Sequence, residues 1–144
     1  MTMEQLEQRT PEEIEVEPAY AFSPETIEQM GLSVGIVVGE RLCDAAHAKL
    51  KDPEAWRSMS YKELRRLLRD NCGNQEGYLS PQAPLLETVV RMLLTAKGDT
   101  LTLGEIHVEI AELWMTSPWP RHISAESMQR VLDNGVSFGI IRAQ

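Results

Sequence analysis

The sequence of 144 residues has few of the features that mark membrane, secreted or metal-binding proteins. Its apolar runs fall well short of the roughly 18 residues that a membrane helix needs. Its first residues are acidic and lack the apolar segment of a secretory signal. Its two cysteines form neither a CxxC pair nor a disulfide framework. These absences favour a protein without a membrane span, located in a reducing cytoplasm.

Motifs that carry chemistry are also scarce. The sequence has no glycine-rich phosphate loop, nucleophile elbow or dinucleotide-binding fingerprint. Cys43 and His47 share a helical spacing and Cys72 could approach them, but a fourth metal ligand is not apparent, so a packed cysteine and a surface histidine are expected. We therefore expect no catalytic site, no metal and no cofactor, although an active site scattered along the chain would leave no such motif.

The net charge of −8 is unevenly distributed. Residues 1–29 contain eight acidic residues and one arginine, whereas residues 30–144 contain 14 acidic and 13 basic residues. Residues 30–144 are therefore nearly neutral and have no long-range electric field that would steer them onto nucleic acid. Their composition is still compatible with a local basic patch. Residues 1–22 combine acidity with two prolines and low hydrophobicity, which predicts a flexible tail.

Helices account for most of the predicted structure. Helical periodicity follows potential capping serines at Ser23, Ser60 and Ser124. Gly35 and Gly39 lie four residues apart, which suits a closely packed neighbour or else only weakens the start of their helix. The predicted helices cover residues 24–30, 33–50, 60–70, 81–97, 103–114 and 124–134, with short strands at 99–102 and 137–142.

The order helix, short strand, helix, turn, helix, strand over residues 82–144 resembles the winged-helix superfamily. The resemblance rests on LLETVVRMLLTAKG, on DTLTLGEIHVEIAELW and on ISAESMQRVLDNGVSFGIIRAQ, the last of which looks like a recognition helix that leads into a strand. It implies a mainly α fold in which a winged-helix-like half with a short strand pair, residues 81–144, packs on an N-terminal helical half, residues 23–80. The second strand of a wing is missing or minimal.

A weak similarity relates two parts of the chain. Residues 60–68 (SYKELRRLL) align with 102–110 (TLGEIHVEI) at an offset of 42. The similarity indicates either a degenerate repeat of a helix-turn-helix unit or two helices that begin with the same capping pattern.

Four cations fall at positions i, i+3, i+4 and i+7 of the predicted helix 60–70 and form one basic stripe: Lys62, Arg65, Arg66 and Arg69. Such a stripe is either a solvated face or a binding surface for an acidic protein, for nucleic acid or for the acidic tail. Trp119 lies between two prolines and is either an exposed interface residue or an aromatic that locks the turn.

Binding of DNA by the C-terminal half would use the outward-facing Gln129 and Arg130, together with Arg121. Residues 82–144 contain five basic and seven acidic residues, which argues against DNA binding by this half alone. Three of the acidic residues form a stripe on the helix before it: Glu105, Glu109 and Glu112.

Complementary basic and acidic stripes in one chain also suit a homodimer or an intramolecular clamp. We therefore expect a non-enzymatic regulatory or adaptor protein that binds a protein partner or a second copy of itself. The alternative is a DNA-binding transcriptional regulator that uses the basic stripe and the recognition helix.

Overall fold

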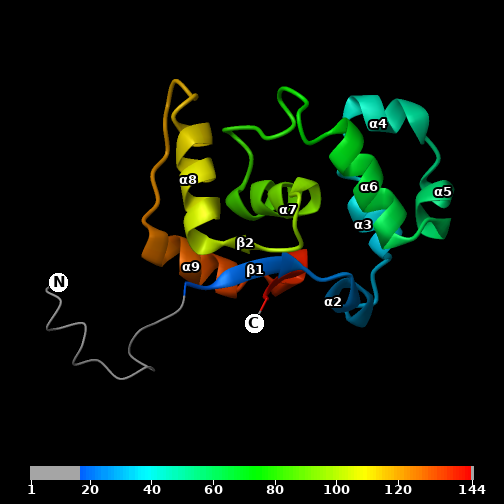
Figure 1. The fold of residues 1–144 in the computed structure, drawn as a ribbon, viewed down its shortest axis with the longest axis horizontal. Helices are drawn as coiled ribbons and strands as arrows, with labels where there is room; N and C mark the ends of the chain where they lie inside the picture. Colours follow the sequence, from blue (N-terminus) through cyan, green and yellow to red (C-terminus); the bar gives the residue numbers. More distant parts are fainter. Residues whose placement is uncertain (1–16, 144) are drawn as a thin grey trace, which may run out of the picture.

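The computed structural model describes residues 17–143, which form a mostly helical molecule with one small antiparallel sheet (Figure 1). The expectation of a mainly α protein is confirmed. The elements in chain order are β1 (Ala19–Phe22), α2 (Pro24–Gln29), α3 (Val34–Gly39), α4 (Asp44–Lys49), α5 (Pro53–Ser58), α6 (Tyr61–Asn71), α7 (Leu85–Thr95), β2 (Leu101–Thr102), α8 (Leu103–Trp114), α9 (Ala125–Asp133), the 3₁₀ helix η1 (Val136–Phe138) and β3 (Ile140–Arg142).

Side-chain caps start the helices where the sequence predicts them. The hydroxyls of Ser23, Ser60 and Ser124 each accept a hydrogen bond from the backbone N–H three residues later, at 3.1 Å in each case. Thr102 and Glu105 form a complete capping box at the start of α8. These bonds satisfy N–H groups that have no partner within the helix, which is why short polar side chains define the boundaries.

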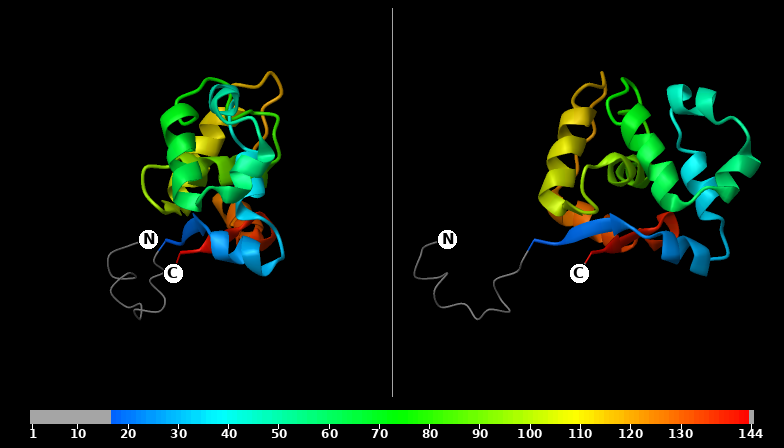
Figure 2. Two further views of the ribbon diagram at one scale, coloured as in Figure 1. Left: turned by 90° about the vertical axis from the view of Figure 1, so that its right-hand side faces the viewer. Right: turned by 45° about the vertical axis from the view of Figure 1, so that its right-hand side comes forward.

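Helix α7 runs through the middle of the molecule, with α8 on one side and α6 on the other (Figures 1 and 2). Pro84 precedes it, so the helix begins four residues later than the predicted 81. Helical periodicity in the sequence predicts eight core residues in the C-terminal half. Six of them are buried and confirm the prediction: Val89, Val90, Leu93, Ile106, Ile110 and Leu132. Leu86 and Val131 are only partly buried.

Strand β1 lies in the centre of the sheet, in the order β2–β1–β3, and was not predicted from the sequence. The two predicted strands are present as β2 and β3, but the expected strand pair is wrong, because each of them pairs with β1 and not with the other. Tyr20 pairs with Leu101 on one side and with Arg142 on the other. Tyr20 and Phe22 point into the core and are buried. The predicted flexible tail of residues 1–22 is therefore wrong for its last residues, because β1 is held by two strands. The prediction for residues 1–16 lies outside the described residues.

Residues 33–50 form two short helices, α3 and α4, in place of the single predicted helix. Gly35 and Gly39 provide the closely packed surface that their spacing suggested, and the neighbour is Trp56 of α5. A Cβ on Gly35 would overlap the Trp56 carbonyl group, and one on Gly39 would overlap the indole ring. The chain turns after Gly39, so that α4 can pack on α6.

Candidate functional site

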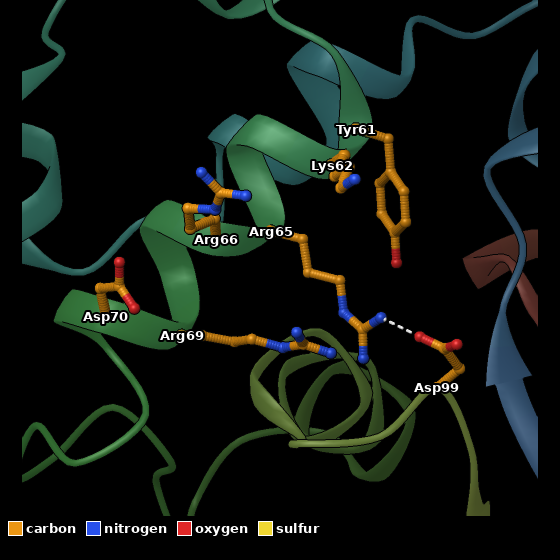
Figure 3. Close-up of a pocket in the computed structure, with 7 residues that line it drawn as sticks. All are labelled: Tyr61, Lys62, Arg65, Arg66, Arg69, Asp70 and Asp99. Atoms are coloured by element: carbon orange, nitrogen blue, oxygen red, sulfur yellow. Dashed lines mark hydrogen bonds and ion pairs between the residues drawn. The ribbon is translucent and has the colours of Figure 1, made fainter.

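A pocket of about 560 Å³ opens on the exposed side of α6, and all four cations of the predicted basic stripe line it (Figure 3). We call it the basic pocket. Six of its residues come from α6, and the seventh follows α7: Tyr61, Lys62, Arg65, Arg66, Arg69, Asp70 and Asp99. Sequence reasoning missed Tyr61, Asp70 and Asp99 as members of this site.

Arg65 is the most deeply placed of these cations, with only 9% of its surface exposed. Its Nη1 donates a hydrogen bond of 2.5 Å to the Asp99 carboxylate. Its Nη2 donates to the carbonyl oxygens of Leu93, Ala96 and Gly98. The last carbonyls of a helix lack partners within the helix and carry partial negative charge. Arg65 therefore caps the C-terminal end of α7.

Arg69 binds the same end of α7, because its Nε donates a 2.8 Å hydrogen bond to the Ala96 carbonyl. Arg65 and Arg69 of the predicted stripe are thus both bonded to the backbone at the end of α7. The interpretation of the stripe as a solvated face is therefore wrong for Arg65, because this side chain is buried and bonded on two sides. Periodicity alone does not distinguish such a residue from a solvated cation, since the carbonyls that it binds lie about 30 residues further along the chain.

Lys62 and Arg66 differ from the two capping arginines. Both are exposed, and neither has a hydrogen bond or an ion pair with another residue in the range 17–143. They stand at the rim of the basic pocket (Figure 3). The pocket therefore combines two fixed guanidinium groups with two cations that are free to meet a ligand.

Tyr61 forms an aromatic wall of the basic pocket. Its ring stacks on Phe22 with 5.7 Å between the ring centroids. Burial raises the pKa of Tyr61. The phenol therefore keeps its proton at neutral pH and can donate a hydrogen bond. Figure 3 shows its hydroxyl pointing toward the space between Arg65 and Asp99.

Asp99 closes one side of the basic pocket with a side chain that is 88% exposed. The hydrogen bond from Arg65 lowers the pKa of this carboxyl group. Asp99 is therefore charged at neutral pH, and it is the anion that Arg65 holds in this structure. It belongs to the loop between α7 and β2.

The other predicted site residues lie apart from the basic pocket. Trp119 is 86% exposed, which favours the interface interpretation over a packed turn. Arg121 lies 4.1 Å above the Trp114 ring and donates hydrogen bonds to the carbonyls of Pro81 and Ala83. Arg121 therefore holds two segments of the chain together. None of these residues contributes to the basic pocket.

The predicted recognition helix is α9. Arg130 is exposed and its guanidinium lies 3.4 Å from the Ser127 hydroxyl, whereas Gln129 is half-buried. A second surface hollow, on α8, gathers the predicted acidic stripe of Glu105, Glu109 and Glu112 together with Glu17 and the exposed Val108.

The cysteines do not form a metal site. Cys43 is buried and His47 is exposed, so the expected packed cysteine and surface histidine are confirmed. Cys43 and Cys72 are also joined in a disulfide, with their Cα atoms 5.5 Å apart, which was not expected from the sequence. The fold brings the loop before α4 onto the end of α6, which the sequence spacing does not reveal. Among residues 17–143, no three His, Cys, Asp or Glu side chains are placed to hold a metal ion. No helix in the same range is long and apolar enough to cross a membrane.

Comparison with family models, with curated proteins and with solved structures finds no match to this chain.

Proposed function

We propose that this protein is a non-enzymatic adaptor or regulatory protein whose basic pocket binds an acidic segment of a partner protein. The observation that supports the proposal most strongly is the pairing of fixed and free cations in one pocket. Arg65 and Arg69 are held by backbone carbonyls, while Lys62 and Arg66 have no partner among the described residues.

Fixed guanidinium groups suit the recognition of carboxylates. A flexible surface cation loses side-chain entropy when it binds, and this loss cancels much of the gain from an ion pair. Arg65 and Arg69 have lost that freedom on folding, because α7 already positions them. Their planar groups can then meet an anion at a smaller entropic cost than exposed lysines would.

The alternative is a DNA-binding regulator. The order α7, β2, α8, α9, β3 is the order that the winged-helix resemblance implies, with β1 between the two strands, and Arg130 is exposed on α9. We therefore also propose a winged-helix-like C-terminal half that packs on the N-terminal helices. The glutamates of α8, the helix in contact with α9, would repel the phosphates of DNA. Protein binding is therefore our preferred function.

A second copy of the chain is one form that the acidic partner could take. The acidic surface on α8 has the opposite charge to the basic pocket, and Val108 adds an exposed apolar side chain to it. Opposite charges on two surfaces of one chain favour association that weakens with salt. Measurement of the mass in solution at low and high salt tests this form directly.

A cytoplasmic location is also a proposal. Disulfides persist mainly in oxidising compartments, so the Cys43–Cys72 bond is unusual for a cytoplasmic protein. Counting free thiols in the protein isolated under conditions that block thiol exchange tests the location: two free thiols agree with the cytoplasm, and none points to an oxidising compartment.

The central experiment measures fluorescence anisotropy with a labelled Glu-rich peptide and with a labelled DNA duplex, over a range of salt concentrations. We expect the peptide to bind, and the double variant Lys62→Ala/Arg66→Ala to abolish binding. Arg130→Ala is the matched control, because it removes an exposed cation from a different helix. Tighter binding of the duplex, lost in Arg130→Ala and retained in the double variant, would support the DNA-binding alternative instead.

A further inference from the structure

One donor in the basic pocket has no acceptor. The Arg65 Nε atom is buried and makes no hydrogen bond with any residue in the range 17–143. The other two nitrogens of the same guanidinium group are bonded to Asp99 and to the end of α7. Buried donors without partners are rare in folded proteins, because the hydrogen bonds that they lose to water are not replaced. The Nε–H lies on the edge of the guanidinium group that it shares with Nη2, toward the end of α7, whereas Nη1 faces Asp99 and the pocket. The Nη1 edge is therefore where an acceptor atom of a ligand would meet Arg65.

The groups around this donor all suit an anion with several oxygens. Figure 3 shows the Tyr61 hydroxyl and the Arg65 and Arg69 guanidinium groups arranged around the space that Asp99 faces. Four cations and two carboxylates line the pocket, which leaves an excess of two positive charges. A phosphate monoester carries a charge of about −1.5 to −2 at neutral pH and offers three strong acceptor oxygens.

Asp99 marks the place that such an anion would take. Its carboxylate is bound to Arg65 but is otherwise exposed, so it can leave without disturbing the core. A carboxylate has one negative charge and two oxygens, and among the described residues only one oxygen of Asp99 accepts a hydrogen bond, from Arg65 Nη1. A phosphate group has a greater charge and one more oxygen, so it can satisfy more of the donors at once.

We propose that the basic pocket binds the phosphate group of a phosphorylated side chain on the partner, in the place that the Asp99 carboxylate occupies. Arg65 and Arg69 bind the phosphate oxygens from the base of the pocket, Tyr61 donates from its wall, and Lys62 and Arg66 contact acidic residues beside the phosphorylated residue. Clusters of arginines serve this purpose in several classes of phosphopeptide-binding domain. This inference rests on the proposed function, because it specifies the partner of the same pocket.

The test compares three Glu-rich peptides that differ at one position, which holds phosphoserine, serine or glutamate, with inorganic phosphate as a fourth probe. Affinity is measured by anisotropy competition. We expect the phosphorylated peptide to bind about tenfold more tightly than the glutamate peptide, as one or two additional charge-assisted hydrogen bonds would give. Inorganic phosphate should compete only weakly, because it lacks the contacts to Lys62 and Arg66.

The site is identified by NMR of the arginine side chains. The Nε–H resonance of Arg65, assigned by comparison with Arg65→Lys, should shift when the phosphorylated peptide is added. Asp99→Asn should strengthen binding of this peptide several-fold, because it removes the competing charge from an exposed position. Lys51→Ala, which removes an exposed cation outside the pocket, is the matched control and should change neither result.

The outcomes separate this inference from the proposed function. If the glutamate and phosphoserine peptides bind equally, the phosphate site is refuted while acidic-segment binding stands. If no peptide binds, both proposals fail. If the phosphorylated peptide binds without moving the Arg65 resonance, its site lies elsewhere and the inference is overturned. Should Arg65→Lys fail to fold, Arg66→Ala and Asp99→Asn still report on the pocket, since both positions are exposed.

Discussion

The Tyr20 hydroxyl donates a 2.8 Å hydrogen bond to the Asp133 carboxylate, which joins the central strand β1 to helix α9. Arg142 of β3 binds the same carboxylate through both of its oxygens, at 2.8 and 2.9 Å. Asp133 of α9 thus links β1, which is far away in the sequence, to β3, which follows α9 closely. Burial, together with the neighbouring Asp133, raises the pKa of Tyr20 to about 12, so the phenol remains a donor at all physiological pH values.

The hydrogen bond between Tyr20 and Asp133 should contribute to the free energy of unfolding. Tyr20→Phe removes one hydrogen bond and leaves Asp133 paired with Arg142, so the free energy of unfolding should fall by about 0.5–1.5 kcal/mol. Asp133→Ala leaves the Tyr20 hydroxyl buried without an acceptor, and it should cost about 1–3 kcal/mol. Urea unfolding of the two variants measures both values. A larger loss for Tyr20→Phe than for Asp133→Ala would contradict this view of the contact.

The pKa of Asp133 makes a second prediction. The hydrogen bond from Arg142 is the main cause that lowers this pKa in the folded state. A group whose pKa is lower when folded stabilises the protein above its unfolded pKa, and this contribution is lost as the pH falls through the folded value. The free energy of unfolding should therefore decrease on acidification below about pH 4. In Asp133→Asn the decrease should be smaller, which unfolding at a series of pH values would show. An unchanged pH dependence would mean that other carboxyl groups cause the loss.

Local features of the structure could be predicted from the sequence, whereas contacts over long distances could not. Ser60 and Thr102 cap helices through residues three positions away, so their pattern is visible in the sequence. Strand β1 has only four residues, and its partners lie at 101–102 and 140–142. Its alternation of alanine with Tyr20 and Phe22 has the period of a strand but is too short to identify one.

The same reasoning applies to the basic pocket. The i, i+3, i+4, i+7 pattern placed four cations on one face of α6, and the structure shows that they line one pocket. The pattern did not reveal that Arg65 is buried or that Asp99 faces it, because α7 and its following loop determine both. The break between α3 and α4 was missed for a similar reason: Gly39 packs on Trp56, which is 17 positions further along the chain.

The packing of Gly39 makes a third prediction. A methyl group at this position would overlap the Trp56 ring, so Gly39→Ala should lower the free energy of unfolding by about 1–3 kcal/mol. Gly98→Ala is the matched control, because a Cβ there would meet no atom within 4 Å and the backbone angle suits any residue. Thermal unfolding of both variants tests the difference. Equal stability of the two would mean that α3 and α5 can separate without cost.

The disulfide makes a fourth prediction. It connects residues 29 positions apart and ties the start of α4 to the end of α6. Closing a loop of this length restricts the unfolded chain, so reduction should lower the free energy of unfolding by about 2–4 kcal/mol. Urea unfolding with and without a reductant measures the effect. The double variant Cys43→Ala/Cys72→Ala should not respond to the reductant, and a response there would show that the effect has another cause.

The last prediction concerns competition for the basic pocket within the chain. Residues 1–16 contain five glutamates and one arginine. They lead into β1, where Ala19 pairs with Thr102, three residues after Asp99 of the pocket. Sixteen residues span up to about 50 Å when extended, so they can reach the pocket from this point. An anion tethered at this distance has an effective concentration in the millimolar range, which is enough to compete at a weak site.

Deletion of residues 1–16 should therefore strengthen binding of a Glu-rich peptide several-fold, as measured by anisotropy at low salt. The deletion must end before β1, because removal of residues 1–22 would take away the central strand and unfold the sheet. A full-length variant with the five glutamates of residues 1–16 changed to Gln is the matched control, since it keeps the length of the segment and removes its negative charge. It should bind the peptide as tightly as the deletion variant does. If both variants bind with the affinity of the unchanged protein, residues 1–16 do not occupy the pocket. Among residues 17–143, the anions that line it are Asp70 and Asp99.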